Sequence, residues 1–331
     1  RSSVSQSVPP APTEPTYQAP SNGVLALLPE KAVPYAELMR LEKPTGLYLF
    51  YFPYLFGITF AACNVEPTVA PVTVFSTSLL LFVGTIIMRG AACTWNDTHD
   101  RNFDRQVART RFRPIARGAV TPLQAHAFTL AQAAVGIATL ASMPANVSLY
   151  AAPNVALLGF YPFAKRITNY PQVILGFPVA WGIFMGSAAL GFDPIVTWIA
   201  EGNLHGIGAA FGCLYASNLV WTIIYDTIYA HQDVEDDKKA GVKSIAVKHK
   251  TNTKPLLSAL SVVQMSTLVA AGVLSGMGPV YYVVSCGGAS ASLAAMVWNV
   301  ELGSPKSCMW WFKNGALLVG GTITLGLFGE Y

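Results

Sequence analysis

Long apolar runs recur along the chain and alternate with short polar segments. Each run is about as long as the roughly 20-residue helix needed to cross a hydrocarbon core of about 30 Å. The pattern therefore predicts about nine transmembrane helices, near residues 46–63, 69–93, 122–142, 146–163, 171–190, 204–228, 255–277, 279–298 and 309–328.

The composition agrees with an all-α, multi-pass membrane protein. The chain is 53% hydrophobic and only 11% charged, and its mean hydropathy is +0.43. An ordinary soluble domain carries about 25% charged residues. No polar interval is long enough for a soluble domain, so residues 34–331 are predicted to form a single transmembrane domain.

Basic residues are confined to one set of loops. All 21 Lys and Arg residues precede the first apolar run, end the second, or lie in every other loop after it. Lys and Arg collect on the cytosolic-type face of a membrane. This distribution places the N-terminus and the even-numbered loops on that face, which in mitochondria is the matrix face.

The N-terminal 33 residues differ from the rest of the chain. They are rich in Ser, Pro and Ala and lack apolar periodicity, which predicts a disordered or loosely docked segment. A transit peptide would also be Ser-rich, but this segment has a single Arg and many prolines. Residues 34–46 are predicted to form a short amphipathic helix at the surface.

Several common site types are excluded by spacing. The five cysteines form no CxxC pair, and neither an HExxH motif nor a GxxxxGK[ST] phosphate loop occurs. A disulfide framework, a zinc site and a nucleotide-binding fold are therefore not expected. Nothing implies a nucleic-acid or protein partner.

Two polar segments on the positive face carry regularly spaced acidic residues. If each preceding helix continues into its segment, side chains four and seven residues apart share one face. The segments are NDTHDRNFD at 96–104 and YDTIYAHQDVEDD at 225–237. The two acidic rows are Asn96, Asp97, Asp100 and Asp104, and Asp226, Asp233 and Asp237.

Such rows require a cationic partner, because like charges one turn apart repel. Carboxylate and amide oxygens suit Mg²⁺, which proteins often share with substrate phosphates. The rows therefore predict a Mg²⁺ and diphosphate site. Two alternatives are solvated loop charges and a transporter of a divalent cation or small substrate. A transporter would place its acidic residues near the bilayer midplane rather than at helix ends.

The motifs resemble those of UbiA-type intramembrane aromatic prenyltransferases. The first row matches NDxxDxxxD, and the second segment matches YDxxYA followed by DxxxD. Further similarity lies in LMRLEKPTG, RTRFRPIARG, YPFAKR and GVKS, which begin at residues 38, 109, 161 and 241. The resemblance covers residues 35–325 and implies nine transmembrane helices around a central cavity that the two Asp-rich loops cap.

The resemblance also implies roles for individual residues. The principal Mg²⁺ ligands would be Asn96, Asp100, Asp233 and Asp237, with Asp97, Asp104 and Asp226 assisting directly or through water. Diphosphate would bind Arg109, Arg113, Lys165 and Lys243, and Arg40 would face the diphosphate or an acceptor carboxylate. The alternative for each basic residue is a topological anchor.

The implied reaction is Mg²⁺-dependent transfer of a prenyl group, expected to be farnesyl, from an allylic diphosphate to a phenolic ring of the aromatic polyketide type. Fungal meroterpenoid enzymes are the most similar branch. The alternative is a 4-hydroxybenzoate polyprenyltransferase of ubiquinone biosynthesis. The corresponding locations are an endomembrane with Asp-rich loops facing the cytosol, and the mitochondrial inner membrane with those loops facing the matrix.

Overall fold

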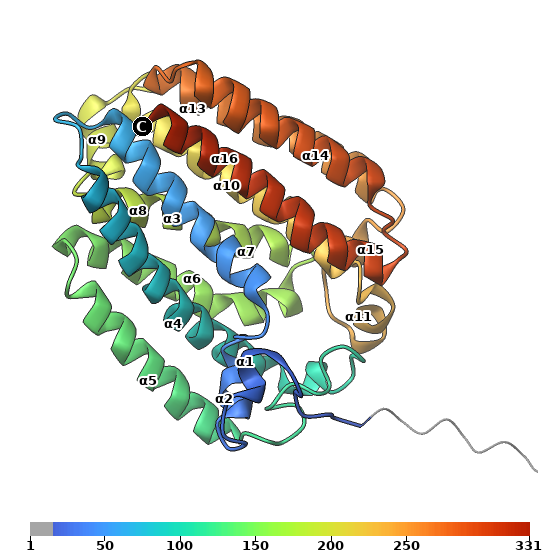
Figure 1. Ribbon diagram of the computed structural model, residues 1–331. Coiled ribbons are helices and arrows are strands. Elements are labelled where there is room, and N and C mark those ends of the chain that lie inside the picture. The colour runs from blue at the N-terminus through green and yellow to red at the C-terminus, as the bar shows by residue number, and fades with distance from the viewer. Residues whose placement is uncertain (1–15) are drawn as a thin grey trace, which may run out of the picture.

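The computed structural model describes residues 16–331 and contains helices but no strand in that range. Figure 1 shows the long helices lying side by side across the molecule. The helices are α1 (Gly23–Ala26), α2 (Val33–Leu38), α3 (Pro44–Asn64), α4 (Pro71–Asp104), α5 (Pro122–Leu140), α6 (Ala145–Ile167), α7 (Pro171–Ala180), α8 (Gly182–Ala189), α9 (Pro194–Glu201), α10 (Ile207–Ala230), α11 (Val234–Ala240), α12 (Ile245–Lys248), α13 (Thr253–Ser275), α14 (Gly288–Asn299), α15 (Pro305–Trp310) and α16 (Ala316–Glu330), with π-helical turns η1 (Tyr281–Gly287) and η2 (Trp311–Gly315). The all-α prediction is confirmed.

The membrane spans agree with the apolar runs. Among residues 16–331, 7 helical segments are long and apolar enough to cross a membrane, and α7 with α8 counts as one of them. They coincide with the first seven predicted runs. The last two runs are also helical, but η1 and η2 interrupt the α-helix there. The multi-pass membrane fold is therefore confirmed, whereas the count of nine remains a prediction.

Large apolar side chains cover the outside of the bundle. Phe75 on α4, Leu130 on α5 and Trp298 on α14 are 69%, 70% and 83% exposed. Soluble monomers rarely expose so many large apolar groups together, and a continuous apolar surface indicates contact with lipid or protein. Inside the bundle, Phe52 and Phe56 pack against Trp221 of α10, and all three are buried.

Helices α3 and α8 cross with their backbones almost in contact. A Cβ atom added to Gly57 would lie 2.0 Å from the carbonyl oxygen of Ile183, and one added to Gly186 would lie 2.4 Å from that of Tyr54. Membrane helices often associate through small residues, because these allow the backbones to approach closely. The crossing therefore requires glycine at both positions.

Replacing Gly57 by Ala is expected to destabilise the protein by about 1–3 kcal/mol, the usual cost of overpacking. The thermal unfolding midpoint of the detergent-solubilised protein measures this change. Gly321→Ala is the matched control, because a Cβ atom at that position meets nothing within 4 Å. Equal midpoints for the two variants would contradict the backbone contact.

The N-terminal part of the described chain packs beside the loop that follows α4 (Figure 1). Tyr17 Oη donates to Glu37 at 2.8 Å, and Arg117 binds the same carboxylate at 2.7 Å. The Arg117 guanidinium also lies 3.7 Å from the centre of the Tyr17 ring. The surface helix predicted at residues 34–46 is only partly present, because α2 ends at Leu38 and α3 begins at Pro44. Residues 1–15 of the predicted disordered or loosely docked segment lie outside the described residues.

Candidate active site

A polar cavity of about 270 Å³ lies where the ends of α4, α6 and α10 meet the loops after α4 and α10. Every residue predicted to bind metal, diphosphate or an acceptor lines it: Arg40, Asn96, Asp97, Asp100, Asp104, Arg109, Arg113, Lys165, Asp226, Asp233, Asp237 and Lys243. The structure thus brings together residues that are far apart in the sequence. Their individual roles remain predictions.

The two acidic rows differ in their backbone. Helix α4 continues to Asp104, so the first row lies on one helix, as predicted. The prediction of a continuous helix for the second row was wrong, because α10 ends at Ala230 and α11 begins at Val234. In the turn between them, the Asp233 N–H donates to the Ala230 carbonyl oxygen. This turn redirects the chain and carries Asp237 to the cavity.

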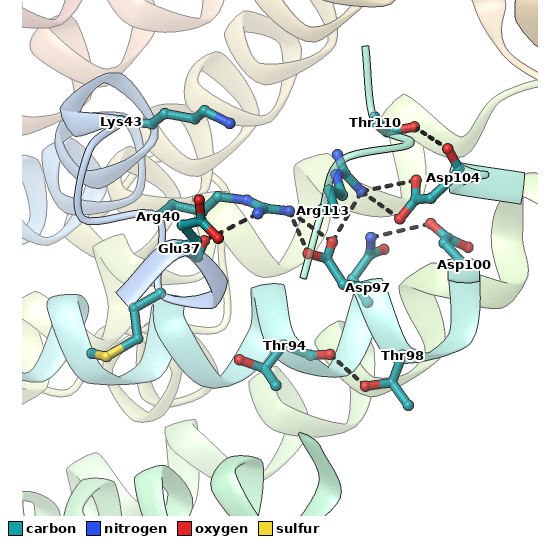
Figure 2. Close-up of polar contacts among 12 residues, drawn as sticks. Glu37, Arg40, Lys43, Thr94, Asp97, Thr98, Asp100, Asp104, Thr110 and Arg113 are labelled. Atoms are coloured by element: carbon teal, nitrogen blue, oxygen red, sulfur yellow. Dashed lines mark hydrogen bonds and ion pairs between the residues drawn. The ribbon is translucent and has the colours of Figure 1, made fainter. Parts of the chain in front are cut away.

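Asp97 is enclosed by two arginines, as Figure 2 shows. Arg40 Nη2 donates to both of its oxygens at 2.6 and 2.7 Å, and Arg113 Nη1 donates to Oδ1 at 2.9 Å. Arg113 also binds Asp104 at 3.0 Å. The side chain of Asp97 is only 1% exposed. A buried carboxylate requires such compensation, because an unpaired buried charge is strongly unfavourable.

The charges around Arg113 act in opposite directions. Burial alone would lower the pKa of its guanidinium, but Asp97 and Asp104 together raise that pKa above its usual value. Arg113 therefore stays charged and stabilises both carboxylates.

Arg40 reaches Asp97 from a constrained backbone. Its φ angle is 57°, in the left-handed region that residues other than glycine seldom occupy. Arg89, near the end of the second apolar run, donates to the carbonyl oxygens of Arg40 and Lys43 at 3.2 and 3.0 Å. Glu37 contributes its own carbonyl oxygen, which accepts from Arg40 Nη1. These bonds fix the turn that directs Arg40 at the acidic row.

Asn96 and Asp100 present oxygens that have no partner. Asn96 Nδ2 donates to Asp100 Oδ2 at 3.1 Å, and Lys165 Nζ binds the same oxygen at 2.8 Å. Within residues 16–331, Asn96 Oδ1 and Asp100 Oδ1 are buried and accept no hydrogen bond. Buried polar atoms without a partner are rare and call for a ligand, an ion or water. Hard oxygens of this kind suit Mg²⁺.

The second row also combines paired and free carboxylates. Arg109 binds Asp233 at 2.5 Å and donates to Tyr229 Oη at 2.7 Å. The carboxylates of Asp226 and Asp237 form no hydrogen bond or ion pair with the described part of the chain. Burial, and then the nearby charge of Asp233, raises the pKa of Asp237 to about 7. A cation beside Asp237 would stabilise its charged form.

The remaining basic residue, Lys243, lines the cavity without an ion pair among residues 16–331. Its backbone N–H donates to the Lys165 carbonyl oxygen at 3.1 Å, which attaches the loop after α11 to the end of α6. Its side chain is the basic group of the site that remains available to an anion.

The donor set fits Mg²⁺, although arginine and lysine hold several of the carboxylates apart. In the described chain, no three Asp, Glu, His or Cys side chains converge on one point. Free oxygens nevertheless come from both rows: Asn96, Asp100, Asp226 and Asp237. A metal ion in this cavity would therefore draw its ligands from both rows.

Sequence reasoning assigned no role in the site to Tyr161, Tyr229 or Glu37. The ammonium of Lys165 lies 5.3 Å from the centre of the Tyr161 ring, and Tyr229 binds Arg109. Both tyrosines stand beside charged residues within the YPFAKR and YDTIYA stretches, which was the available signal. Glu37 binds Arg117, 80 positions away in the sequence, and no local pattern reveals that pairing.

The family model described as "UbiA prenyltransferase family" matches residues 50–319, most of the chain. The chain belongs to the UbiA prenyltransferase family. This UbiA-family enzyme carries both of the Asp-rich motifs at one cavity, in agreement with the resemblance seen in its sequence.

Curated relatives of the UbiA-family enzyme fall into two groups. Prenyltransferase ascA of Acremonium egyptiacum is 35% identical over 320 residues, covering 96% of this chain and 92% of that protein. The DMOA farnesyltransferase nvfB of Aspergillus novofumigatus is 36% identical, covering 93% and 94%. The mitochondrial 4-hydroxybenzoate polyprenyltransferase of Schizosaccharomyces pombe is 38% identical, covering 88% and 79%.

Solved structures share the fold of this UbiA-family enzyme. An apo UbiA homolog from Aeropyrum pernix has a TM-score of 0.69 at 22% identity, covering 86% of this chain and 98% of that one. A UbiA homolog from Archaeoglobus fulgidus bound to GPP and Mg²⁺ has a TM-score of 0.64 at 18% identity, covering 90% and 99%.

Proposed function

We propose that this prenyltransferase transfers a farnesyl group from farnesyl diphosphate to a phenolic ring of the aromatic polyketide type, with Mg²⁺ as cofactor. One observation carries the proposal: free oxygens of both acidic rows and the basic residues Lys165, Arg109 and Arg113 line the same cavity. The oxygens can bind the metal cofactor, and the basic residues can bind the diphosphate of the substrate. The relative from Aspergillus novofumigatus is a DMOA farnesyltransferase, which supports the farnesyl assignment.

Asn96, Asp100, Asp226 and Asp237 would hold the metal, with Asp233 joining them once Arg109 turns to the diphosphate. The chemistry that Mg²⁺ supplies when bound is stabilisation of the negative charge on the departing diphosphate. Asp97 and Asp104 would have a different role. Asp97 binds Arg40 and Arg113, and Asp104 binds Arg113, so these carboxylates hold the two arginines in place.

The chain's own residues then guide the reaction. Lys165, Arg109 and Lys243 orient the diphosphate, and the bond between its oxygen and the allylic carbon breaks with the electron pair leaving on diphosphate. A pair of ring electrons of the acceptor forms the new carbon–carbon bond, and the ring loses one proton. Apolar walls at Phe50 and Leu158 exclude water, which would otherwise capture the cation.

A second candidate acceptor is 4-hydroxybenzoate, in ubiquinone biosynthesis. The identity of 38% to the Schizosaccharomyces pombe enzyme favours it. The two candidates imply different membranes: the polyketide acceptor suggests an endomembrane with the cavity facing the cytosol, and 4-hydroxybenzoate suggests the mitochondrial inner membrane with the cavity facing the matrix. The transporter alternative loses support, because the acidic residues lie at helix ends and the chain belongs to a prenyltransferase family.

An assay of purified protein in lipid or detergent tests the proposal. The protein is incubated with Mg²⁺, geranyl, farnesyl or geranylgeranyl diphosphate and a panel of phenolic acids that includes 4-hydroxybenzoate, and products are identified by mass spectrometry. Mg²⁺-dependent farnesylation of a polyketide-type acceptor is expected. Transfer to 4-hydroxybenzoate alone would select the second candidate, and no product with any pair would refute both.

Removing divalent metal with EDTA is expected to abolish product formation, because the free carboxylates can hold diphosphate only through a cation. Adding excess Mg²⁺ should restore the rate, as measured by diphosphate release. Full activity in EDTA would contradict the metal assignment.

A further inference from the structure

A groove of about 780 Å³ lies between α13 and α14, at one edge of the bundle (Figure 1). Small-molecule sites typically have volumes of about 300–1,000 Å³. The floor of the groove is apolar and buried, since Leu293 and Val297 are 1% and 8% exposed. Its rim carries Val262 and Trp298, which are 67% and 83% exposed. The groove therefore opens to the medium that surrounds the bundle.

Small side chains leave room along both walls of the groove. Ser258 and Ser261 line it on α13, and Ala294 lines it on α14. The Ser258 hydroxyl donates to the Lys254 carbonyl oxygen at 3.1 Å. The Ser261 hydroxyl donates to the Leu257 carbonyl oxygen at 2.8 Å. Because both hydroxyl donors are bound within the helix, hydrocarbon can occupy the groove without leaving them unpaired.

A cation lies at one end of the groove. Lys254 Nζ donates to the Trp298 carbonyl oxygen at 2.9 Å, near the C-terminal end of α14, where the helix dipole attracts positive charge. An ammonium group has three N–H donors, and Lys254 forms no ion pair with the described part of the chain. The lysine can therefore bind an anion at the end of an apolar groove.

The groove has the length of one leaflet of a bilayer. His231, which follows α10, shares a hydrogen bond of 3.1 Å with Thr253, the first residue of α13, so Lys254 lies at the end of the bundle that carries the catalytic cavity. From Lys254 to Ser266, which also lines the groove, the helix rises about 18 Å. Half of a hydrocarbon core is about 15 Å deep. Lys254 therefore lies where lipid headgroups lie.

We propose that this groove binds an anionic phospholipid, with its phosphate at Lys254 and an acyl chain between α13 and α14. The groups of such a lipid follow the same order as the groups of the groove, an anion at one end and hydrocarbon beyond it. Charge complementarity favours an anionic over a zwitterionic lipid, because basic residues at the membrane surface attract anionic headgroups. No described residue lines both this groove and the catalytic cavity, so the inference is independent of the prenyl donor and acceptor.

Photolabelling in vesicles tests the proposal. The protein is reconstituted in phosphatidylcholine vesicles that contain a trace of a lipid with a diazirine in one acyl chain, and labelled peptides are identified by mass spectrometry. The probe is either phosphatidylglycerol, which is anionic, or phosphatidylcholine. Phosphatidylglycerol should label α13 and α14 about fivefold more than phosphatidylcholine, the factor expected for one basic residue at the membrane surface.

Removing the charge tests the headgroup contact. Lys254→Gln should abolish the preference for phosphatidylglycerol, because a neutral amide attracts both headgroups equally. Lys306→Gln is the matched control, since Lys306 is an exposed lysine on α15 and does not line the groove. This variant should keep the fivefold preference.

Filling the groove tests the acyl-chain contact. Ala294→Leu should lower labelling of α13 and α14 by both probes by about tenfold, because the larger side chain displaces methylene groups of the lipid. Ala295→Leu, at the exposed neighbour that does not line the groove, is the matched control. The thermal unfolding midpoint in detergent shows whether each variant is folded.

Equal labelling by the two probes in the parent protein would overturn the charge contact. Unchanged labelling in both Lys254→Gln and Ala294→Leu would overturn the lipid site. Crosslinks between two copies of the chain in vesicles, lost in Ala294→Leu, would also overturn it and would assign the groove to a protein interface.

Discussion

Asp237→Asn is expected to reduce prenyl transfer by at least about 100-fold while the protein still folds. The substitution keeps the side-chain shape but removes a free carboxylate charge from the cavity. Loss of several kcal/mol of metal-assisted charge stabilisation corresponds to roughly a 10²- to 10³-fold lower rate. The rate of diphosphate release at saturating substrate measures the loss of activity, and the thermal unfolding midpoint measures whether the variant still folds.

The matched control is the neighbouring residue. Asp236 lies outside the row, and its carboxylate accepts from the backbone N–H of Ala108, so Asp236→Asn should retain most of the activity. Asp100→Asn should behave like Asp237→Asn, because Asp100 carries a free oxygen in the other row. Full activity in either Asp237→Asn or Asp100→Asn would remove that residue from the metal site.

Arg113→Leu is expected to cause the largest loss of stability, about 3–5 kcal/mol, because removing one partner of a buried ion pair leaves an uncompensated charge. Here two carboxylates, Asp97 and Asp104, lose their shared partner. The expected observation is a much lower thermal midpoint and a low yield of monodisperse protein from size-exclusion chromatography.

A second substitution makes the cause identifiable. Combining Arg113→Leu with Asp104→Asn removes one of the two carboxylate charges that Arg113 had compensated. Part of the lost stability should therefore return, even though activity does not. Arg101→Leu is the control for loss of a nearby arginine, since Arg101 has no ion pair within residues 16–331. A stable Arg113→Leu protein would show that solvent, rather than Arg113, compensates the carboxylates.

Local periodicity was sufficient to predict most of the fold and the first acidic row. An apolar run of about 20 residues has one stable conformation in lipid, because backbone groups must bond within the segment. The row on α4 follows from the same helix continuing to Asp104. The second row was predicted on a continuous helix and lies instead on two helices, since the turn before Asp233 depends on tertiary contacts such as the one between His231 and Thr253.

Long-range pairing was not predictable from one sequence. Arg40 and Asp97 are 57 positions apart, and Arg109 and Asp233 are 124 apart. Spacing rules describe neighbours on one helix, so they identified the charged residues without assigning their partners. Arg109, Arg113 and Lys165 bind the acidic rows in the structure, and their binding of diphosphate stays a prediction.

Mutual neutralisation couples the binding of the two ligands. The cavity is lined by six aspartates and five basic residues, and ion pairs between them neutralise much of the charge that either ligand would meet. A metal ion that frees Lys165 and Arg109 from their carboxylates creates the anion site, and an anion that captures them exposes the metal ligands. Each ligand should therefore raise the affinity for the other by the same factor, because thermodynamic coupling between two sites is reciprocal.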